Sequence, residues 1–185
     1  MEKSLTKKER LILANQYEIL SKLTEDEYEK KQYENIRDAF REGFTWGYSL
    51  ATDGLSEEVT GQECCFVLDV LDMYSSLYFS REKSKEAKDA INEKEVLFVG
   101  FDLNDLQECR YFSFYKFLVE DLGRFNEYKE WMDIGKIEGF NSHGSGPSME
   151  KLLRMIQKEK ELKRIRHERH DLYFTKEEIQ EILNA

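Results

Sequence analysis

Apolar side chains recur at intervals of three and four residues along most of this chain, the spacing that places them on one face of an α-helix. A single proline and ten glycines occur in 185 residues, whereas folds made of many short strands use more of both. The pattern therefore predicts an all-α, multi-helical fold of about seven helices. The clearest predicted helices cover residues 6–23, 24–43, 60–80, 104–122, 147–170 and 175–183.

Four of these helices begin at a capping box. In this motif a Thr hydroxyl accepts from the backbone N–H three residues on, and a Glu there bonds back to the Thr backbone. The boxes pair Thr6 with Glu9, Thr24 with Glu27, Thr60 with Glu63, and Thr175 with Glu178. A weaker box, Asn104 with Gln107, marks the helix near residues 104–122. The first two boxes predict an antiparallel hairpin with almost no loop.

Residues 96–125 are the most apolar and aromatic part of the chain. In a helix, the side chains from Tyr111 to Val119 are apolar almost all the way round, so other helices or another subunit must cover them. We expect this helix, near residues 104–122, to be the centre of the core. Residues 96–99, before Gly100, are too few to distinguish a strand from the end of a helix.

The length of the chain fits a single domain, residues 1–185. Residues 81–95 alternate in charge and show no core face, so we expect a solvated loop or frayed helix, a mobile insertion in the domain. Residues 139–146 form a glycine-rich loop before Pro147. A loop that leads into a helix can bind an anion, but this one lacks the ending of a nucleotide-binding P-loop. A flexible connector is the favoured interpretation.

The net charge, the apolar runs and the cysteine count limit the classes of partner and the cellular compartment that we expect for this protein. The net charge is −10 and the isoelectric point is near 5.0, which argues against generic binding to nucleic acids or anionic membranes. The first residues lack the apolar run of a signal peptide, and no stretch approaches the roughly 18 apolar residues of a membrane span. Three cysteines, an odd number, indicate free thiols in a reducing cytoplasm.

Residues 151–170 depart from the acidic balance, with eight Lys or Arg side chains against three Glu. Such a run suits docking against the acidic part of the same fold or of a sister subunit, which is the favoured interpretation. A solvated face and RNA contact are the alternatives. No aromatic side chains that could stack on bases interleave with the run, which weakens the RNA interpretation.

No motif predicts a metal, a cofactor or a catalytic residue. Cys64 and Cys65 are adjacent, so on a helix they point about 100° apart and cannot grip one ion as a CxxC pair does. Together with Cys109 they are expected to be small core residues. His167 and His170 share a helix face but lack a third ligand. HExxH, GxSxG and dinucleotide-binding motifs are absent.

Five polar residues are candidates for a binding site: Asp69, Asp72, Arg110, Arg124 and Asn141. Asp69 and Asp72 lie one turn apart on an otherwise apolar helix. They suit an acid–base pair or, as favoured, exposed groups and partners of an arginine. Arg110 begins the aromatic helix, and a buried arginine normally has a carboxylate partner. Asn141 would join these three in a polar pocket, and Arg124 is the fifth candidate.

A series of short motifs resembles the YfbU family, a group of uncharacterised bacterial proteins. They cover nearly the whole chain in order: RLIL and NQY within residues 10–17, DMY at 72–74, FVGFD at 98–102, RY at 110–111, GRF at 123–125, GFN at 139–141, EI at 178–179 and ILNA at 182–185. The chain departs from the family pattern at residues 81–95 and 142–146, where it is longer. The resemblance implies an all-helical fold, and it carries over no activity and no catalytic residue.

These observations favour a cytoplasmic, non-enzymatic interaction or regulatory protein that self-associates as a homo-oligomer and has an unidentified protein partner. The surplus of aromatic surface and the separation of charge are the reasons. Two alternatives stay open. One is an enzyme with a polar pocket near Asp69, Asp72, Arg110 and Asn141. The other is a nucleic-acid binder that uses the basic helix at residues 151–170.

Overall fold

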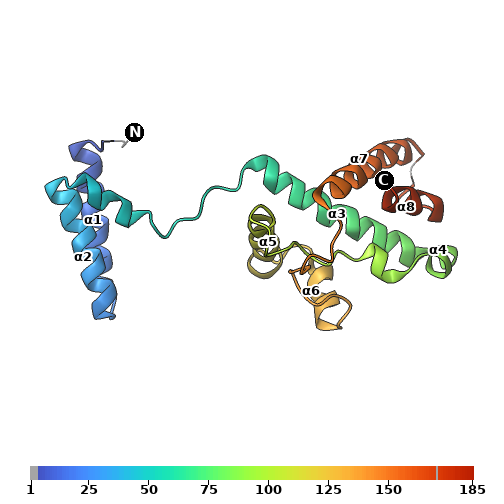
Figure 1. Cartoon of the computed structure of the whole chain (residues 1–185), viewed down its shortest axis with the longest axis horizontal. Coiled ribbons are helices and arrows are strands. Elements are labelled where there is room, and N and C mark those ends of the chain that lie inside the picture. The colour runs from blue at the N-terminus through green and yellow to red at the C-terminus, as the bar shows by residue number, and fades with distance from the viewer. Residues whose placement is uncertain (1–3, 170) are drawn as a thin grey trace. The chain divides into compact units, whose positions relative to one another are not determined.

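The computed structural model describes residues 4–169 and 171–185 (Figure 1). Their regular structure is helical, apart from an isolated parallel bridge between Phe101 and Asn141. The all-α fold expected from the sequence is confirmed. The α-helices in this part of the chain are α1 (Lys7–Leu23), α2 (Glu27–Glu42), α3 (Gly61–Lys83), α4 (Lys85–Ala90), α5 (Glu108–Lys116), α6 (Asn126–Asp133), α7 (Met149–Arg169) and α8 (Lys176–Leu183). Shorter helical turns are η1 (Thr45–Ala51), η2 (Glu93–Val96) and η3 (Phe117–Asp121).

The chain divides into two compact units, residues 1–58 and residues 59–185. We call them the N-terminal unit and the C-terminal unit. Each has a hydrophobic cluster of its own. That the whole chain behaves as one domain stays a prediction.

The N-terminal unit is a hairpin of α1 and α2 followed by η1 (Figure 1). Its cluster is built on three buried residues, Ala14, Ile36 and Phe40. The Phe40 ring stacks on Tyr17 and on Tyr48, with ring centroids 5.9 and 5.0 Å away. This is a small core, and single cores in units of about 60 residues are marginal in stability.

Three of the four predicted capping boxes are confirmed. Thr6, Thr60 and Thr175 each accept from the N–H three residues on, and the Glu at that position accepts from the Thr backbone N–H. The starts of α1, α3 and α8 are therefore encoded locally, within four consecutive residues.

The fourth predicted box, at the start of α2, is wrong. The cap is Asp26, whose carboxylate accepts from the N–H groups of Tyr28 and Glu29. Thr24 donates its hydroxyl to Glu29 instead. A carboxylate at the positive end of a helix is a better acceptor than a neutral hydroxyl, so Asp26 displaces Thr24 from the capping position.

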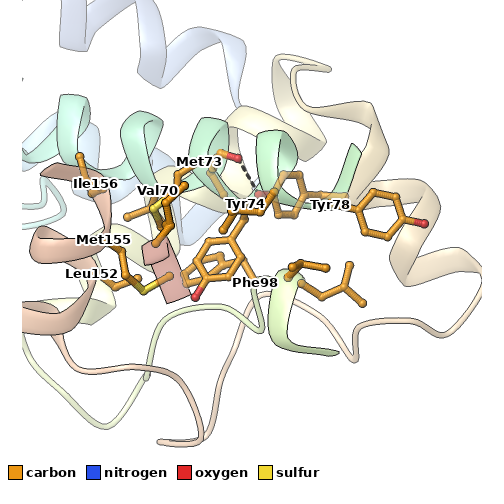
Figure 2. Packing of buried hydrophobic residues seen from close by; sticks show 14 of the residues in the cluster. Val70, Met73, Tyr74, Tyr78, Phe98, Leu152, Met155 and Ile156 are labelled. Carbon is orange, nitrogen blue, oxygen red and sulfur yellow. Dashed lines mark hydrogen bonds between the residues drawn. The ribbon is translucent and has the colours of Figure 1, made fainter. Parts of the chain in front are cut away.

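Helix α3 is the element on which the C-terminal unit assembles, since α5, α7 and α8 all pack against it. Its buried side chains include Val67, Val70, Leu71, Tyr74 and Leu77. Figure 2 shows side chains of α3 close to side chains of α7 and to the Phe98 ring. The labelled residues are Val70, Met73, Tyr74 and Tyr78 of α3, and Leu152, Met155 and Ile156 of α7. The core is thus a meeting of helices that are distant in sequence.

The aromatic helix predicted near residues 104–122 is present as α5 followed by η3, a π-helical turn. It starts later than expected because the Asp105 carboxylate accepts from the N–H groups of Gln107 and Glu108, and this bonding closes a turn before the helix. Tyr115 is fully buried and touches several other rings of the core. Phe117 is 44% exposed, so this helix is not covered on every side.

Residues 81–95 have regular structure, comprising the end of α3, then α4 and η2. Ala87 and Ile91 belong to the core, and Arg81 donates to the carbonyl oxygen of Ile91 at 2.8 Å. The expectation that this segment has no core face is wrong, because two apolar side chains one helical turn apart suffice to anchor it. Its mobility stays a prediction.

Residues 97–100 are neither helix nor paired strand. The chain then meets the 139–146 loop at Phe101, whose N–H donates to Phe140 and whose carbonyl accepts from Ser142, each at 3.0 Å. Gly100 has φ of +105°, and a Cβ there would overlap the Phe140 carbonyl. Glycine is required at this crossing for both reasons.

Candidate functional site

Two of the predicted candidates, Asp69 and Asp72, lie on α3 where it packs against α7. Lys160 of α7 donates to Asp69, with 2.5 Å between Nζ and Oδ2. Glu159 of α7 is buried and forms an ion pair with Lys163. The charge of Lys163 also acts on Asp72. We call these five residues the α3–α7 seam.

The seam contains two carboxyl groups that hold their protons more tightly than usual. Burial raises the pKa of Glu159, and partial desolvation raises the pKa of Asp72, which is exposed overall. The negative charge of Asp69 adds to both shifts, and Lys163 opposes both. Raised carboxyl pKa values occur at catalytic sites, but ion-pair networks that only stabilise a fold produce them too. The seam can hold or release a proton, and this alone does not define a reaction.

Two polar contacts, one of them half-buried, connect α6 to α3. Ser75 donates to Glu127 at 2.6 Å, and the Tyr128 hydroxyl donates to the Leu71 carbonyl at 2.8 Å. Within the described residues the fully buried Tyr115 hydroxyl has no hydrogen-bond partner. Burial raises the pKa of Tyr115 and Tyr128 well above the ordinary value. These phenols stay neutral, so they suit packing and hydrogen bonding rather than proton transfer.

The five predicted candidates do not come together in one pocket. Arg110 lies beside Glu63 at the start of α3, with 3.5 Å between Nη1 and Oε1. Asn141 accepts from the N–H groups of His143 and Leu103, and so ties its own loop to residue 103. Arg124 is exposed, and its charge lowers the pKa of Asp72. Asp72 and Asn141 line two different clefts. The assignment of these residues to a binding site stays a prediction.

The basic helix is partly neutralised by carboxylates of the same unit. Four of its basic side chains form ion pairs: Lys158 with Glu161 and Glu181, Lys160 with Asp69, Lys163 with Glu159, and Arg166 with Glu178. Arg166 is buried, and its guanidinium lies over the Phe174 ring at 5.4 Å. Lys160 and Arg166 thus reach carboxylates of α3 and α8, whereas Lys163 pairs within α7. That the basic run serves for docking stays a prediction.

The structure gives no support to a metal site in the part of the chain it describes, where no group of three or more His, Cys, Asp or Glu is placed to hold an ion. Cys64 and Cys109 are half-buried near backbone carbonyl groups. Cys65 is exposed, so the expectation that it is a core residue is wrong. His170 lies outside the described residues, and with it the pair that it forms with His167.

An apolar surface on the N-terminal unit was missed by the sequence analysis. Ten large apolar side chains there are each at least 40% exposed: Leu11, Ile12, Ile19, Leu20, Leu23, Tyr28, Phe44, Trp46, Leu50 and Leu55. We call this set the N-terminal apolar surface. Helical spacing marks these positions as apolar, but it does not reveal that α2 covers only part of the broad apolar arc of α1. In the sequence, the sign of this exposed surface was the wide arc of apolar positions around α1.

A groove of about 620 Å³ lies within this unit, between α1, α2 and η1. Leu13, Tyr17 and Leu20 line one side of it, and Trp46 and Tyr48 line the other. Its size fits a small ligand, while its apolar lining and the exposed side chains around it equally fit a helix of another chain.

In the described residues, no helix is both long and apolar enough to cross a membrane. Residues 3–185 match the model of the YfbU domain. The chain is 35% identical over 183 residues to the UPF0304 protein MJECS11 of Methanocaldococcus jannaschii, which covers 98% of this chain and 99% of that protein. The resemblance seen in the short motifs is thereby confirmed, and the chain belongs to the YfbU family.

Proposed function

We propose that this protein is a non-enzymatic interaction protein that acts as a homo-oligomer, and that its subunits associate through the N-terminal apolar surface. The observation that carries the proposal is the ten large apolar side chains left exposed on a unit of 58 residues. Soluble proteins rarely expose apolar patches of this kind unless they are interaction sites.

The small core of the N-terminal unit supports the proposal that a second subunit covers its apolar surface. Its hydrophobic cluster has three buried residues, fewer than a stable independent core of this size needs. Burying one large apolar side chain contributes about 1.5–3 kcal/mol. Covering the exposed residues therefore supplies the stability that the small internal core lacks.

A second copy of this chain is the occupant that α1 suits best. Ile12, Ile19 and Leu23 are separated by seven and four residues, so they form one stripe along the helix. They are 49%, 58% and 73% exposed. Two copies related by a two-fold axis present the same stripe to each other, which makes the contact self-complementary.

The test is the oligomeric state of the full chain and of its Ile19→Glu variant, measured by size-exclusion chromatography with light scattering over a range of protein concentrations. The substitution places a charge in the middle of the stripe. In a two-fold dimer each subunit brings one such charge into the interface. We expect the dissociation constant to rise at least about a hundredfold. The oligomer should also persist in about 1 M salt, because apolar contacts are not screened.

The matched control is Leu106→Glu. Leu106 is 90% exposed on the C-terminal unit, so the variant adds the same charge at an exposed leucine elsewhere. Its oligomeric state should equal that of the unmodified protein. A monomer at every salt and at micromolar concentrations, or equal dissociation by both variants, would refute self-association through this surface.

The two alternatives have less support. An enzyme needs convergent polar groups, whereas Arg110 pairs with Glu63 and Asn141 lines a separate cleft from Asp72. An RNA-binding helix needs unopposed cations, and four basic side chains of α7 already have carboxylate partners.

A further inference from the structure

The groove between α1, α2 and η1 in the N-terminal unit has an uncharged lining. It measures about 620 Å³, and none of the described residues that line it is Asp, Glu, Lys, Arg or His. This is unusual for a chain in which 36% of the residues are charged. A charged ligand would lose its hydration in this groove without gaining an ion pair. The groove therefore suits an uncharged occupant.

Aromatic rings form much of this groove. Phe40 is 2% exposed and stacks on Tyr17 and Tyr48, and all three residues line the groove. Trp46 of η1 also lines it but is 81% exposed, and in the described part of the chain its indole ring contacts no other aromatic ring. Aromatic rings attract one another in offset-stacked and edge-to-face arrangements. A planar aromatic ligand would therefore find partner rings in this groove.

Two polar side chains of the groove are available to a ligand. The hydroxyl groups of Tyr17, Ser49 and Thr52 already donate to carbonyl groups of η1, at 3.5, 3.3 and 3.1 Å. Gln16 and Thr45 line the same groove, and within the residues that the structure describes their side chains form no hydrogen bond. An amide and a hydroxyl can each donate and accept. They suit the polar edge of an otherwise apolar ligand.

The groove is distinct from the stripe through which we expect the subunits to associate. Ile12, Ile19 and Leu23 do not line it, and Leu20 and Trp46 are the members of the N-terminal apolar surface that do. Self-association and occupation of the groove can therefore be tested separately. The volume of the groove also lies within the range of about 300–1,000 Å³ that is typical of small-molecule sites.

We propose that this groove binds a small, uncharged, planar aromatic compound with a hydrogen-bonding edge. The rings of the compound lie against Phe40 and its stacked neighbours and are covered by Trp46, while its polar edge bonds to Gln16 or Thr45. Binding ties η1 to α1 and so adds apolar contacts to a unit whose own core is small. The proposal goes beyond self-association and does not require it.

The test measures how the full chain binds phenylnaphthylamine, an uncharged aromatic probe whose fluorescence rises in an apolar site. The Trp131→Phe variant leaves Trp46 as the single tryptophan, so the excitation energy of Trp46 should be transferred to the bound probe. Naphthol should displace the probe at least about tenfold better than decahydronaphthol, its saturated analogue, because only naphthol is aromatic. The absence of transfer from Trp46, or equal displacement by both compounds, would overturn the proposal.

A matched pair of serine variants tests where the probe binds. Ser49 lines the groove, whereas Ser56 is exposed in the same unit and does not line it. Ser49→Asp places a charge in the lining and should weaken probe binding at least about tenfold, while Ser56→Asp should bind as the unmodified protein does. Trp46→Ala should weaken binding, and Trp46→Phe should largely preserve it. Equal affinity of the two serine variants would show that the probe binds elsewhere, and the proposal would then be wrong.

The Ile19→Glu variant separates this proposal from self-association. Ile19 does not line the groove, so the variant should bind the probe with unchanged affinity whatever its oligomeric state. Loss of probe binding in this variant would place the probe between subunits instead of in the groove, and the proposal would fail. A protein that is monomeric throughout, but whose probe binding responds to the changes at Ser49 and Trp46, would refute self-association alone.

Discussion

Glu159 shows how one buried carboxylate can set part of the pH response of this protein. It is 4% exposed, and burial raises its pKa above the ordinary value of 4.5 although Lys163 lies beside it. A carboxyl group with a raised pKa binds its proton more tightly in the folded than in the unfolded protein. Its stabilising contribution is therefore fully present below about pH 4.5 and is lost as the pH rises through the folded pKa.

The variant Glu159→Gln tests this residue. Glutamine has the shape of the protonated acid, so at pH 7 we expect the variant to have a larger free energy of unfolding than the unmodified protein. Lys163 is half exposed and can be hydrated when its partner is lost. The difference should close as the pH falls toward about 4.5, because Glu159 then becomes neutral too. Urea unfolding at a series of pH values measures it.

Glu161→Gln provides the matched control for this series. Glu161 is on the same helix, but its side chain is 52% exposed, where it pairs with Lys158. Its substitution should leave the pH dependence unchanged. If Glu159→Gln is less stable than the unmodified protein at every pH, the ion pair with Lys163 outweighs the cost of burial, and our interpretation of the seam fails.

At the scale of the elements, helix starts decide where the chain changes direction. Local chemistry specifies most of them, as at Thr6, Thr60 and Thr175. At α2 two local signals compete within three residues, and the carboxylate of Asp26 takes the capping position. Helix α2 therefore begins at Glu27, two residues later than a cap at Thr24 would place it.

Two substitutions separate the competing signals. Asp26→Ala removes the acceptor for two backbone N–H groups and should lower the free energy of unfolding by about 1 kcal/mol. Thr24→Ala removes an exposed hydroxyl that donates to Glu29 and accepts from the Asp26 N–H, and should cost no more than a few tenths of a kcal/mol. Thermal unfolding at one fixed protein concentration compares them. A larger loss of unfolding free energy for Thr24→Ala than for Asp26→Ala would support the capping box predicted at Thr24 instead.

At the scale of the whole molecule, the chain is organised as two compact units joined at residues 55–60, which have no regular structure. Almost all residues from Thr52 to Thr60 are exposed. Family membership spans both units, since the YfbU match covers residues 3–185. The units are therefore parts of one inherited sequence with a connection that is accessible to solvent.

Limited proteolysis tests this connection. A protease that cuts after glutamate should cleave first after Glu57 or Glu58, because exposed segments without regular structure are the preferred sites of nicking. Mass spectrometry at short times should find a fragment that begins near residue 59. Glu9 and Glu120, which are exposed within helical segments, provide internal controls. First cuts within those segments would show that the connection is protected.

Much of the fold could be predicted because its signals are local. The helical class and three helix caps follow from residues close in sequence, while the anchoring of residues 81–95 escaped because it rests on only two side chains, Ala87 and Ile91. The candidate site was less predictable. Asp69 and Asp72 were singled out, but their partners Lys160 and Lys163 come from a distant helix. Spacing along one helix carries no information about which other helix packs on it.

What the sequence by itself determined is the helical class, the starts of α1, α3 and α8, and the family, since each depends on hydrophobic periodicity or on short contiguous motifs. Only the tertiary structure decided which face of α1 is covered, which lysines oppose the acids of α3, and that Phe101 pairs with the loop at residues 140–142. The physical reason is that burial and pairing depend on both partners of a contact. The residues of a single segment limit the contacts that it can make, and the packing of distant segments determines which of those contacts form.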